Sequence, residues 1–284
     1  MPIDVATALA AEPRSTELTW DHKDVLLYHL GLGAGVPATD PAELRYTLES
    51  RLRVLPSFAT VAGGALGVMD ALGTPGIEVD LAGVLHGGQR IDVHRPIPVA
   101  GTATATTRVA AVHDKGKAAV IVLRADVADA DGPLWSCDVE LFARGAGGFG
   151  GERGGSERLA PPERAPDLTL ERGVREEQAL LYRLSGDWNP LHADPEFAAL
   201  AGFDRPILHG LCTYGMTLKA LVDTALDGDA SRVRGYRTRF AGVVFPGETL
   251  RIRAWRLDEH RLQAAVTVAD RDDAPVLSDT VVEF

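Results

Sequence analysis

The residues best suited to chemistry lie in one short loop. Asp187 and His192 are five positions apart in the stretch LSGDWNPLH, residues 184–192. A carboxylate and an imidazole that hold one water can serve as base and acid, because one removes a proton from the attacking water while the other protonates carbon. Asn189, between them, can both donate and accept a hydrogen bond. This chemistry is what hydration of a conjugated thioester requires.

The same loop also fits a purely structural role. Aspartate is a good N-cap and proline is tolerated in the first helical turn, so Asp187 could cap a helix that starts near Asn189 and Pro190. His192 would then be an ordinary half-buried side chain. An isolated Asp-x-Asn-Pro pattern favours this alternative. We favour the catalytic interpretation because a second His-Gly pair follows shortly downstream.

That second pair, His209 and Gly210, precedes a predicted helix over residues 211–226. The first N–H groups of a helix lack intrahelical partners and lie at the positive end of its dipole, so they can stabilise negative charge on a thioester oxygen. Glycine lets a ligand approach the backbone closely. We therefore predict an oxyanion site at Gly210; the alternative is a glycine that only permits a tight start to the helix.

A metal site is the other possible use of Asp187, His192 and His209. All three are possible ligands, but the sequence has no histidine pair at i, i+4 and no cysteine cluster. Hydration of a conjugated thioester does not need a metal. We therefore predict no metal and no cofactor.

The two halves of the chain resemble weak copies of each other. Each ends in three runs rich in Val, Ala, Leu and Thr, which predict strands. The runs span 102–112, 117–127 and 134–144 in the first half, and 249–257, 262–270 and 276–284 in the second. Each half also has a Leu-His-Gly, at residues 85–87 and 208–210, but only the second precedes a helical pattern. We predict a duplicated α+β architecture whose first copy has a shortened helix, leaving a hollow for an apolar group.

A change in composition separates the halves. A glycine-rich stretch at residues 144–151 leads into a run of Glu, Arg, Pro and Ser that buries little apolar surface. We predict a first unit at 1–144, a linker at 145–170 and a second unit at 171–284.

The overall composition restricts partners and location. The net charge of −11 and pI near 5.2 argue against a nucleic-acid partner, which would favour a basic surface. Two cysteines form no disulfide framework, and the N-terminus has no signal-peptide pattern. The longest apolar stretch, residues 58–69, is too short and too rich in Gly and Ala to span a bilayer. We expect a cytoplasmic protein without a membrane partner.

These motifs resemble those of a known family. The stretches YRLSGDWNPLH (182–192) and ILHGLC (207–212) are similar to the hydratase-2 motif of MaoC-like enoyl-CoA hydratases. In the first half, LGLGA (30–34), LPSF (55–58), LHGGQ (85–89), RPIP (95–98) and GGFGG (147–151) resemble the hydratase-2 unit of peroxisomal multifunctional enzyme type 2. The resemblance implies a double hotdog fold and reversible hydration of trans-2-enoyl-CoA to (3R)-3-hydroxyacyl-CoA.

The resemblance also implies roles for individual residues. Asp187 and His192 are the catalytic pair, Asn189 orients them, and the Gly210 N–H binds the thioester oxygen. Glu49, which precedes the LPSF segment, is a further catalytic candidate, although a surface glutamate fits equally well. The implied substrate-binding set is His86, Gly87, His209, Leu211, Arg239 and Phe240. The partner implied is an acyl-CoA substrate, and family association of hotdog sheets predicts a homodimer.

Three other functions share parts of this pattern. A dehydratase acting on 3-hydroxyacyl groups of a carrier protein, or on a polyketide intermediate, would use the same motifs around the reacting carbons. A non-catalytic acyl-CoA-binding subunit would be expected to lack Asp187 or His192, yet both are present. A hotdog thioesterase would leave the loop around Asp187 unexplained.

Overall fold

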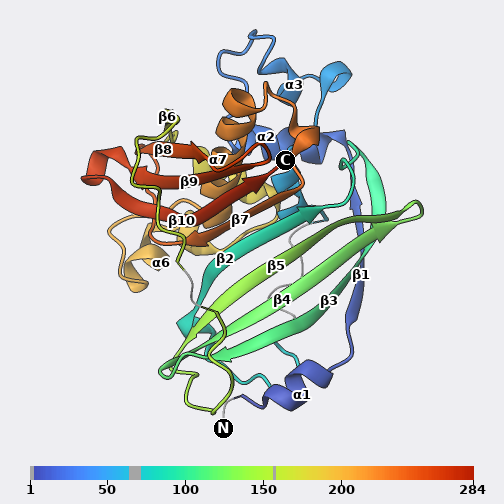
Figure 1. Ribbon diagram of the computed structural model, residues 1–284, viewed down its shortest axis with the longest axis vertical. Coiled ribbons are helices and arrows are strands. Elements are labelled where there is room, and N and C mark those ends of the chain that lie inside the picture. Colours follow the sequence, from blue (N-terminus) through green and yellow to red (C-terminus); the bar gives the residue numbers. More distant parts are fainter. Residues whose placement is uncertain (1–2, 64–71, 156–157) are drawn as a thin grey trace.

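A computed structural model describes residues 3–63, 72–155 and 158–284. Ten strands form one antiparallel sheet in the order β1-β3-β4-β5-β2-β7-β10-β9-β8-β6 (Figure 1). The strands of the first half are β1 (Arg14–Trp20), β2 (Val84–Val93), β3 (Gly101–Asp114), β4 (Ala118–Asp129) and β5 (Gly132–Arg144). Those of the second half are β6 (Leu168–Gly173), β7 (Gly235–Phe240), β8 (Thr249–Arg256), β9 (Arg261–Val268) and β10 (Ala274–Glu283).

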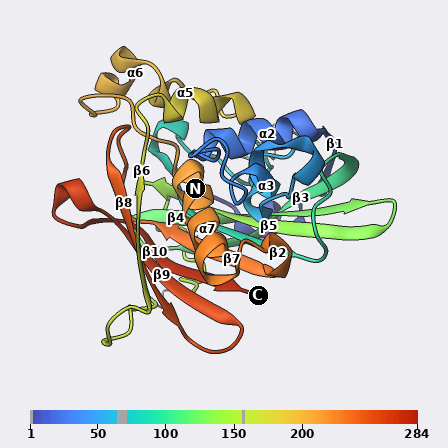
Figure 2. The same ribbon diagram turned by 90° about the horizontal axis from the view of Figure 1, so that it is seen from above.

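Helices cover one side of this sheet, and the sheet curves around α7 (Figure 2). The described α-helices are α1 (Val5–Ala10), α2 (His22–Gly31), α3 (Leu44–Thr47), α5 (Gln178–Tyr182), α6 (Pro195–Leu200) and α7 (Gly210–Ala225). The 3-10 turns are η1 (Glu49–Arg51), η2 (Pro56–Thr60), η3 (Leu81–Gly83), η4 (Arg183–Ser185), η5 (Pro190–His192), η6 (Ala230–Arg232) and η7 (Ala269–Arg271). No described helix is long and apolar enough to cross a bilayer.

The six predicted strand runs are confirmed as β3 to β5 and β8 to β10. Buried and less buried side chains alternate along these strands. In β4 nearly every second side chain is buried, as expected for a strand with one face on a core. The helix predicted over 211–226 is α7, whose residues from Cys212 to Val222 are all buried. Burial around its whole circumference explains why α7 is apolar on more than one face.

The sheet has an internal two-fold arrangement. Read from either edge, the strand order is the same, since β1-β3-β4-β5-β2 matches β6-β8-β9-β10-β7. The two central strands, β2 and β7, are antiparallel neighbours with Gly88 opposite Arg239 and Asp92 opposite Gly235. The predicted duplicated α+β architecture is thus confirmed, and both units share one sheet and one main core.

The predicted match between the two Leu-His-Gly tripeptides is wrong. Residues 85–87 lie inside β2, whereas residues 208–210 lead into α7. In chain order, the segment equivalent to the start of α7 lies between β1 and β2, where Leu55 leads into η2. LPSFAT at 55–60 therefore corresponds to LHGLCT at 208–213. The predicted shortening of the first helix falls partly on residues 64–71, outside the described residues, and stays a prediction.

The connection between the units is held by hydrogen bonds. The Asp114 carboxylate accepts N–H bonds from Gly116, Gly148 and Gly150, which fixes the glycine-rich stretch. Further along, the Gln263 amide donates to two carbonyls of the connection, at 3.1 and 3.0 Å. β5 ends at residue 144, directly before the predicted linker. β6 begins at residue 168, so its first three residues lie within the segment predicted as linker. The boundaries of the two units stay a prediction.

Candidate active site

The loop that carries Asp187 is shaped by short-range hydrogen bonds. The Asn189 side-chain oxygen accepts from the Leu191 N–H at 3.0 Å, so Asn189 is the N-cap of η5. The Asp187 carboxylate accepts from the Asn189 N–H at 3.2 Å. The structural alternative expected Asp187 to be the cap, but Asn189 is the cap. Asn189 thus links Asp187 to the turn that ends in His192. Because the Asp187 carboxylate accepts only this one hydrogen bond from the described residues, most of it is free for a ligand.

His192 is held in one orientation and one tautomer. Its Nδ1–H donates to the Ile207 carbonyl at 2.9 Å, which leaves Nε2 unprotonated and able to accept a proton. The residue is 9% exposed. Burial lowers the pKa of His192, and this outweighs the opposite effects of the Ile207 carbonyl and of Asp187. A neutral imidazole is the form that can act as a base.

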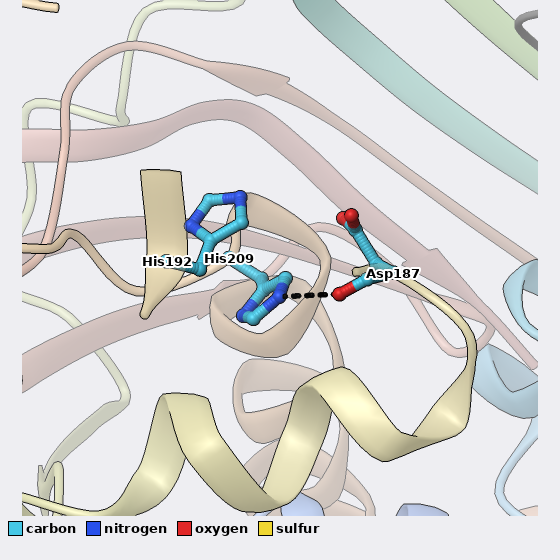
Figure 3. Close-up of side chains that lie close together, drawn as sticks. All are labelled: Asp187, His192 and His209. Atoms are coloured by element: carbon cyan, nitrogen blue, oxygen red, sulfur yellow. Dashed lines mark hydrogen bonds between the residues drawn. The ribbon is translucent and has the colours of Figure 1, made fainter. Parts of the chain in front are cut away.

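His209 stacks on His192 and contacts Asp187 (Figure 3). The two ring centroids are 3.7 Å apart with planes inclined by 27°. His209 Nε2 donates to the main-chain oxygen of Asp187 at 3.3 Å. Burial and the neighbouring His192 keep the pKa of His209 well below its ordinary value. His209 is therefore a neutral support that fixes both members of the pair.

One ligand atom of each of Asp187, His192 and His209 lies within 4.8 Å of the others, so the three are a possible metal-binding group. Imidazole lone pairs lie in the ring plane, and two stacked rings do not direct theirs at one point. One ring would have to turn before both could bind the same ion. The arrangement suits a bound water better than a metal, and the predicted absence of a metal stays a prediction.

Gly210 is the first residue of α7 and is exposed. The N-cap residue His209 makes no side-chain bond to the first turn, and a helix supplies no internal acceptor for its first N–H groups. A Cβ at Gly210 would lie 3.0 Å from Cε1 of Phe240. A side chain at this position would press on the nearby ring, and the Gly210 N–H remains available to a ligand.

His86 and Phe240 bring the first unit into the site. Their ring centroids are 4.7 Å apart in an edge-to-face contact, because β2 and β7 pair with Gly88 opposite Arg239. Burial lowers the pKa of His86 to about 4, while the charge of Asp187 acts in the opposite direction. Two residues predicted to bind substrate, from different halves of the chain, therefore lie beside Gly210 and Asp187.

The other predicted residues are placed differently. Arg239 precedes Phe240 in β7 and so points to the opposite face of the sheet, where it lies 3.7 Å from Asp279. Glu49 is exposed on η1. Gly87 lies in β2 next to His86, and Leu211 packs partly against the main core. Their predicted roles stay predictions.

Two residues near the site were not singled out from the sequence. The Tyr182 ring lies 5.0 Å from that of His209, and its buried hydroxyl has no hydrogen-bond partner among the residues that the structure describes. The Arg183 guanidinium lies 4.8 Å from the centre of the Trp188 ring. A signal for Tyr182 exists: LLY occurs at 26–28 and again at 180–182, and the two tyrosine rings are 6.0 Å apart.

Comparison with known proteins agrees with this geometry. Residues 157–275 match the family model described as MaoC like domain, and residues 18–145 match that of the MFE-2 hydratase 2 N-terminal domain. Enoyl-CoA hydratase ChsH3 of Mycobacterium tuberculosis is 51% identical over 98% of both chains. The chain thus belongs to the MaoC-like dehydratases. Within them it belongs to the two-unit enoyl-CoA hydratase 2 family, whose members are hydro-lyases.

Solved structures support the same assignment. The crystal structure of a MaoC-like dehydratase from Phytophthora capsici has a TM-score of 0.90 and 29% identity, covering 99% of this chain and 98% of that one. A Mycobacterium tuberculosis protein described as a double hotdog fold has a TM-score of 0.58 at 14% identity, covering 99% and 98%. The second likeness concerns the fold alone. The predicted double hotdog fold is confirmed.

Proposed function

We propose that the protein catalyses reversible hydration of trans-2-enoyl-CoA to (3R)-3-hydroxyacyl-CoA. The observation that carries this proposal is the grouping of the Asp187 carboxylate and the His192 imidazole with His209, the residue directly before the free N–H of Gly210. They supply the two proton-transfer groups and the oxyanion donor that the reaction needs. The R configuration is carried over from the family.

In the hydration direction, Asp187 and His192 hold one water. The unprotonated Nε2 of His192 accepts a proton from that water as the water oxygen bonds to C3, and the electrons of the C2–C3 double bond move toward the thioester oxygen. The Gly210 N–H stabilises the resulting negative charge, assisted by the dipole of α7. His192 then returns the proton taken from water to C2, which restores the carbonyl and leaves His192 neutral again. One water is consumed and both of its hydrogens are retained in the product.

The surrounding residues position this pair. His209 fixes the main chain of Asp187 and stacks on His192, while the Ile207 carbonyl sets the His192 tautomer. An orientation set by several contacts reduces the motion that must be lost at the transition state. We assign Asn189 and His209 as positioning residues.

The substrate proposed is a coenzyme A thioester, with no cofactor and no metal. A homodimer and a cytoplasmic location stay predictions. A carrier-protein thioester would use the same groups at the reacting carbons, so turnover of CoA-linked and carrier-linked crotonyl groups separates the two substrates. Activity on the carrier-linked substrate alone would overturn our choice.

The direct test is a hydration assay with short to long trans-2-enoyl-CoAs, followed by chiral analysis of the product. We expect loss of the enoyl absorbance and formation of the 3R product. Binding of crotonyl-CoA without a change in enoyl absorbance would instead identify a non-catalytic acyl-CoA-binding subunit.

A further inference from the structure

The first unit contains a cavity at the place that corresponds to the candidate active site. Its volume is about 200 Å³, and Pro56 and Val93 are among the residues that line it. Pro56 is the counterpart of His209. Val93 is the counterpart of Phe240 when GQRIDV in β2 is aligned with GYRTRF in β7, because this alignment matches Gly and Arg. The internal two-fold arrangement therefore relates the cavity to the site in the second unit.

The cavity is separate from the candidate active site. Val93 lies five residues beyond Gly88, which is opposite Arg239 at the active-site end of β7. A strand rises about 3.3 Å per residue, so the two places are about 15–20 Å apart along the central strands. Among the described residues that line the cavity, none is an aspartate, a glutamate or a histidine. A ligand can therefore bind there without acid–base chemistry.

The wall of the cavity is apolar. Its buried residues include Val93, Ile97, Ala230 and Val233. Val99 is 38% exposed, so the cavity opens to solvent beside it. An apolar cavity of about 150 Å³ is large enough for benzene, so this cavity can hold a chain of about six carbons.

The rim of the cavity carries positive charge. Arg53 lines the cavity and is exposed. Arg234 donates to the carbonyl of Ser231, another lining residue, at 3.4 Å. The neighbouring acid is Asp229: hydrogen bonds from Ser231 lower its pKa, and Arg53 and Arg232 lower it further. The rim therefore attracts an anion, although the net charge of the whole chain is −11.

We propose that this cavity binds a free fatty acid, with the alkyl chain inside the apolar wall and the carboxylate beside Arg53. A guanidinium offers several donors to a carboxylate. A thioester fits less well, because its oxygen needs an N–H donor, whereas Pro56 has no N–H and Ser57 is completely buried. Binding at this place is a second property of the chain and needs no hydratase activity.

Chain length provides the first test. Each buried methylene strengthens binding by about fourfold, so affinity should rise by this factor per carbon from butyrate to hexanoate. It should stop rising at about eight carbons, when the cavity is full. Isothermal titration calorimetry with the wild-type protein measures the series. No binding of hexanoate at millimolar concentration, or equal affinity for butyrate and hexanoate, would overturn the inference.

Cavity-filling variants test the position. Val93→Phe and Ala230→Leu both add side-chain volume to the wall. A group that does not fit a rigid apolar pocket costs about 10-fold to 200-fold, so each variant should weaken hexanoate binding at least about tenfold. Thermal unfolding checks that the variants are folded, and Ala230→Leu keeps the test valid if Val93→Phe is not. Wild-type affinity in a folded variant would place the ligand elsewhere and contradict the inference.

The charge of the ligand is tested with hexanoate and 1-hexanol. Arg53→Gln should weaken hexanoate binding by about twofold to fivefold, as expected for an exposed ion pair, and should leave hexanol binding unchanged. Arg172→Gln removes an exposed arginine from β6 and is the matched control, which should alter neither. Equal affinity of the wild-type protein for hexanoate and hexanol would overturn the assignment of a carboxylate.

Butyryl-CoA, a saturated thioester that cannot be hydrated, distinguishes the two sites. We expect the affinity for hexanoate to be unchanged in excess butyryl-CoA. Displacement would overturn the inference: with hexanoate binding retained in Val93→Phe, the acid occupies the active site, and with binding lost in that variant, the cavity takes the thioester. Failure of the proposed function is distinguishable, because wild-type protein would then bind hexanoate without hydrating crotonyl-CoA.

Discussion

The start of α7 and the start of η2 occupy equivalent places in the two units, yet only one of them is suited to catalysis. In the second unit His209 supplies an imidazole contact to Asp187, and Gly210 exposes its N–H. In the first unit Pro56 has no N–H, and Ser57, the counterpart of Gly210, is completely buried. An equivalent backbone position is therefore not enough: the site also needs an accessible N–H and a polar side chain in front of it.

The largest difference between the units should come from His192, which we expect to have no functional equivalent in the first unit. His192→Ala removes the unprotonated Nε2 and should lower kcat for crotonyl-CoA by about 10²–10⁴. The assay is the loss of enoyl absorbance at equal concentrations of folded protein. A rate close to that of wild type would refute the assignment.

The comparison of Gly210 with Ser57 gives the next effect. Gly210→Ala places a methyl group 3.0 Å from the Phe240 ring, so the ring or the first turn of α7 must move. A displacement of about 1 Å in a catalytic group costs about 100-fold in rate, so a shift of a few tenths of an ångström should cost less, on the order of threefold to tenfold. We expect a loss of kcat of that size in steady-state assays. Ser57→Ala, the matched change in the first unit, should leave kcat near the wild-type value. Equal losses of kcat in both variants would contradict the claim that only the second unit is catalytic.

The second site also predicts a pH dependence. Burial lowers the pKa of His192 from the ordinary 6.5, so the imidazole stays neutral until the pH falls below that value. Protonation then removes the lone pair on Nε2. The acid limb of kcat/KM for crotonyl-CoA should therefore have its midpoint below pH 6.5. A midpoint at or above this value would show that His192 is not the group that titrates.

In the first unit, His29 should affect stability rather than activity. Its Nδ1–H donates to the Tyr46 carbonyl at 3.0 Å and its Nε2 accepts from the Leu55 N–H at 3.2 Å. His29→Leu leaves both buried backbone groups without a partner, which should lower the free energy of unfolding by about 1–3 kcal/mol. Urea unfolding measures this loss. A loss of kcat without any loss of stability would contradict a structural role.

The same residue contributes to the pH dependence of stability. Burial lowers the pKa of His29 to about 3, whereas an unfolded chain takes up the proton near 6.5. The unfolded state thus binds more protons as the pH falls below 6.5, and the free energy of unfolding decreases toward pH 3. His29→Leu should weaken this decrease, and an identical pH dependence in the variant would argue against it.

Local patterns predicted much of the fold and of the catalytic loop. Strand alternation located β3 to β5 and β8 to β10, and an apolar helical pattern located α7. The grouping of Asp187 with His192 followed from a short loop whose residues are close in sequence. The structural alternative placed a cap at Asp187, whereas Asn189 is the N-cap; both residue types are good N-caps, and only the course of the backbone decides between them.

Local patterns do not reveal the register of the repeat or the contacts between distant segments. The tripeptide at 85–87 was matched to 208–210, because three identical residues cannot fix the register of a diverged repeat. The contact between His86 and Phe240 depends on the pairing of β2 with β7, which no local pattern reveals. Arg239 and Phe240 were both predicted to bind substrate from a resemblance to a family segment; they face opposite sides of β7 because adjacent residues of a strand alternate, and the role of Arg239 stays a prediction.

The central claim is that hydration occurs at Asp187 in the second unit. The most direct measurement is the rate of crotonyl-CoA hydration by wild type and by Asp187→Asn, a substitution that removes the negative charge with little change in shape. We predict hydration to the 3R product by wild type and a loss of about 10²–10⁴ in kcat in the variant, with binding of crotonyl-CoA retained. A variant rate within a few-fold of wild type would contradict the account.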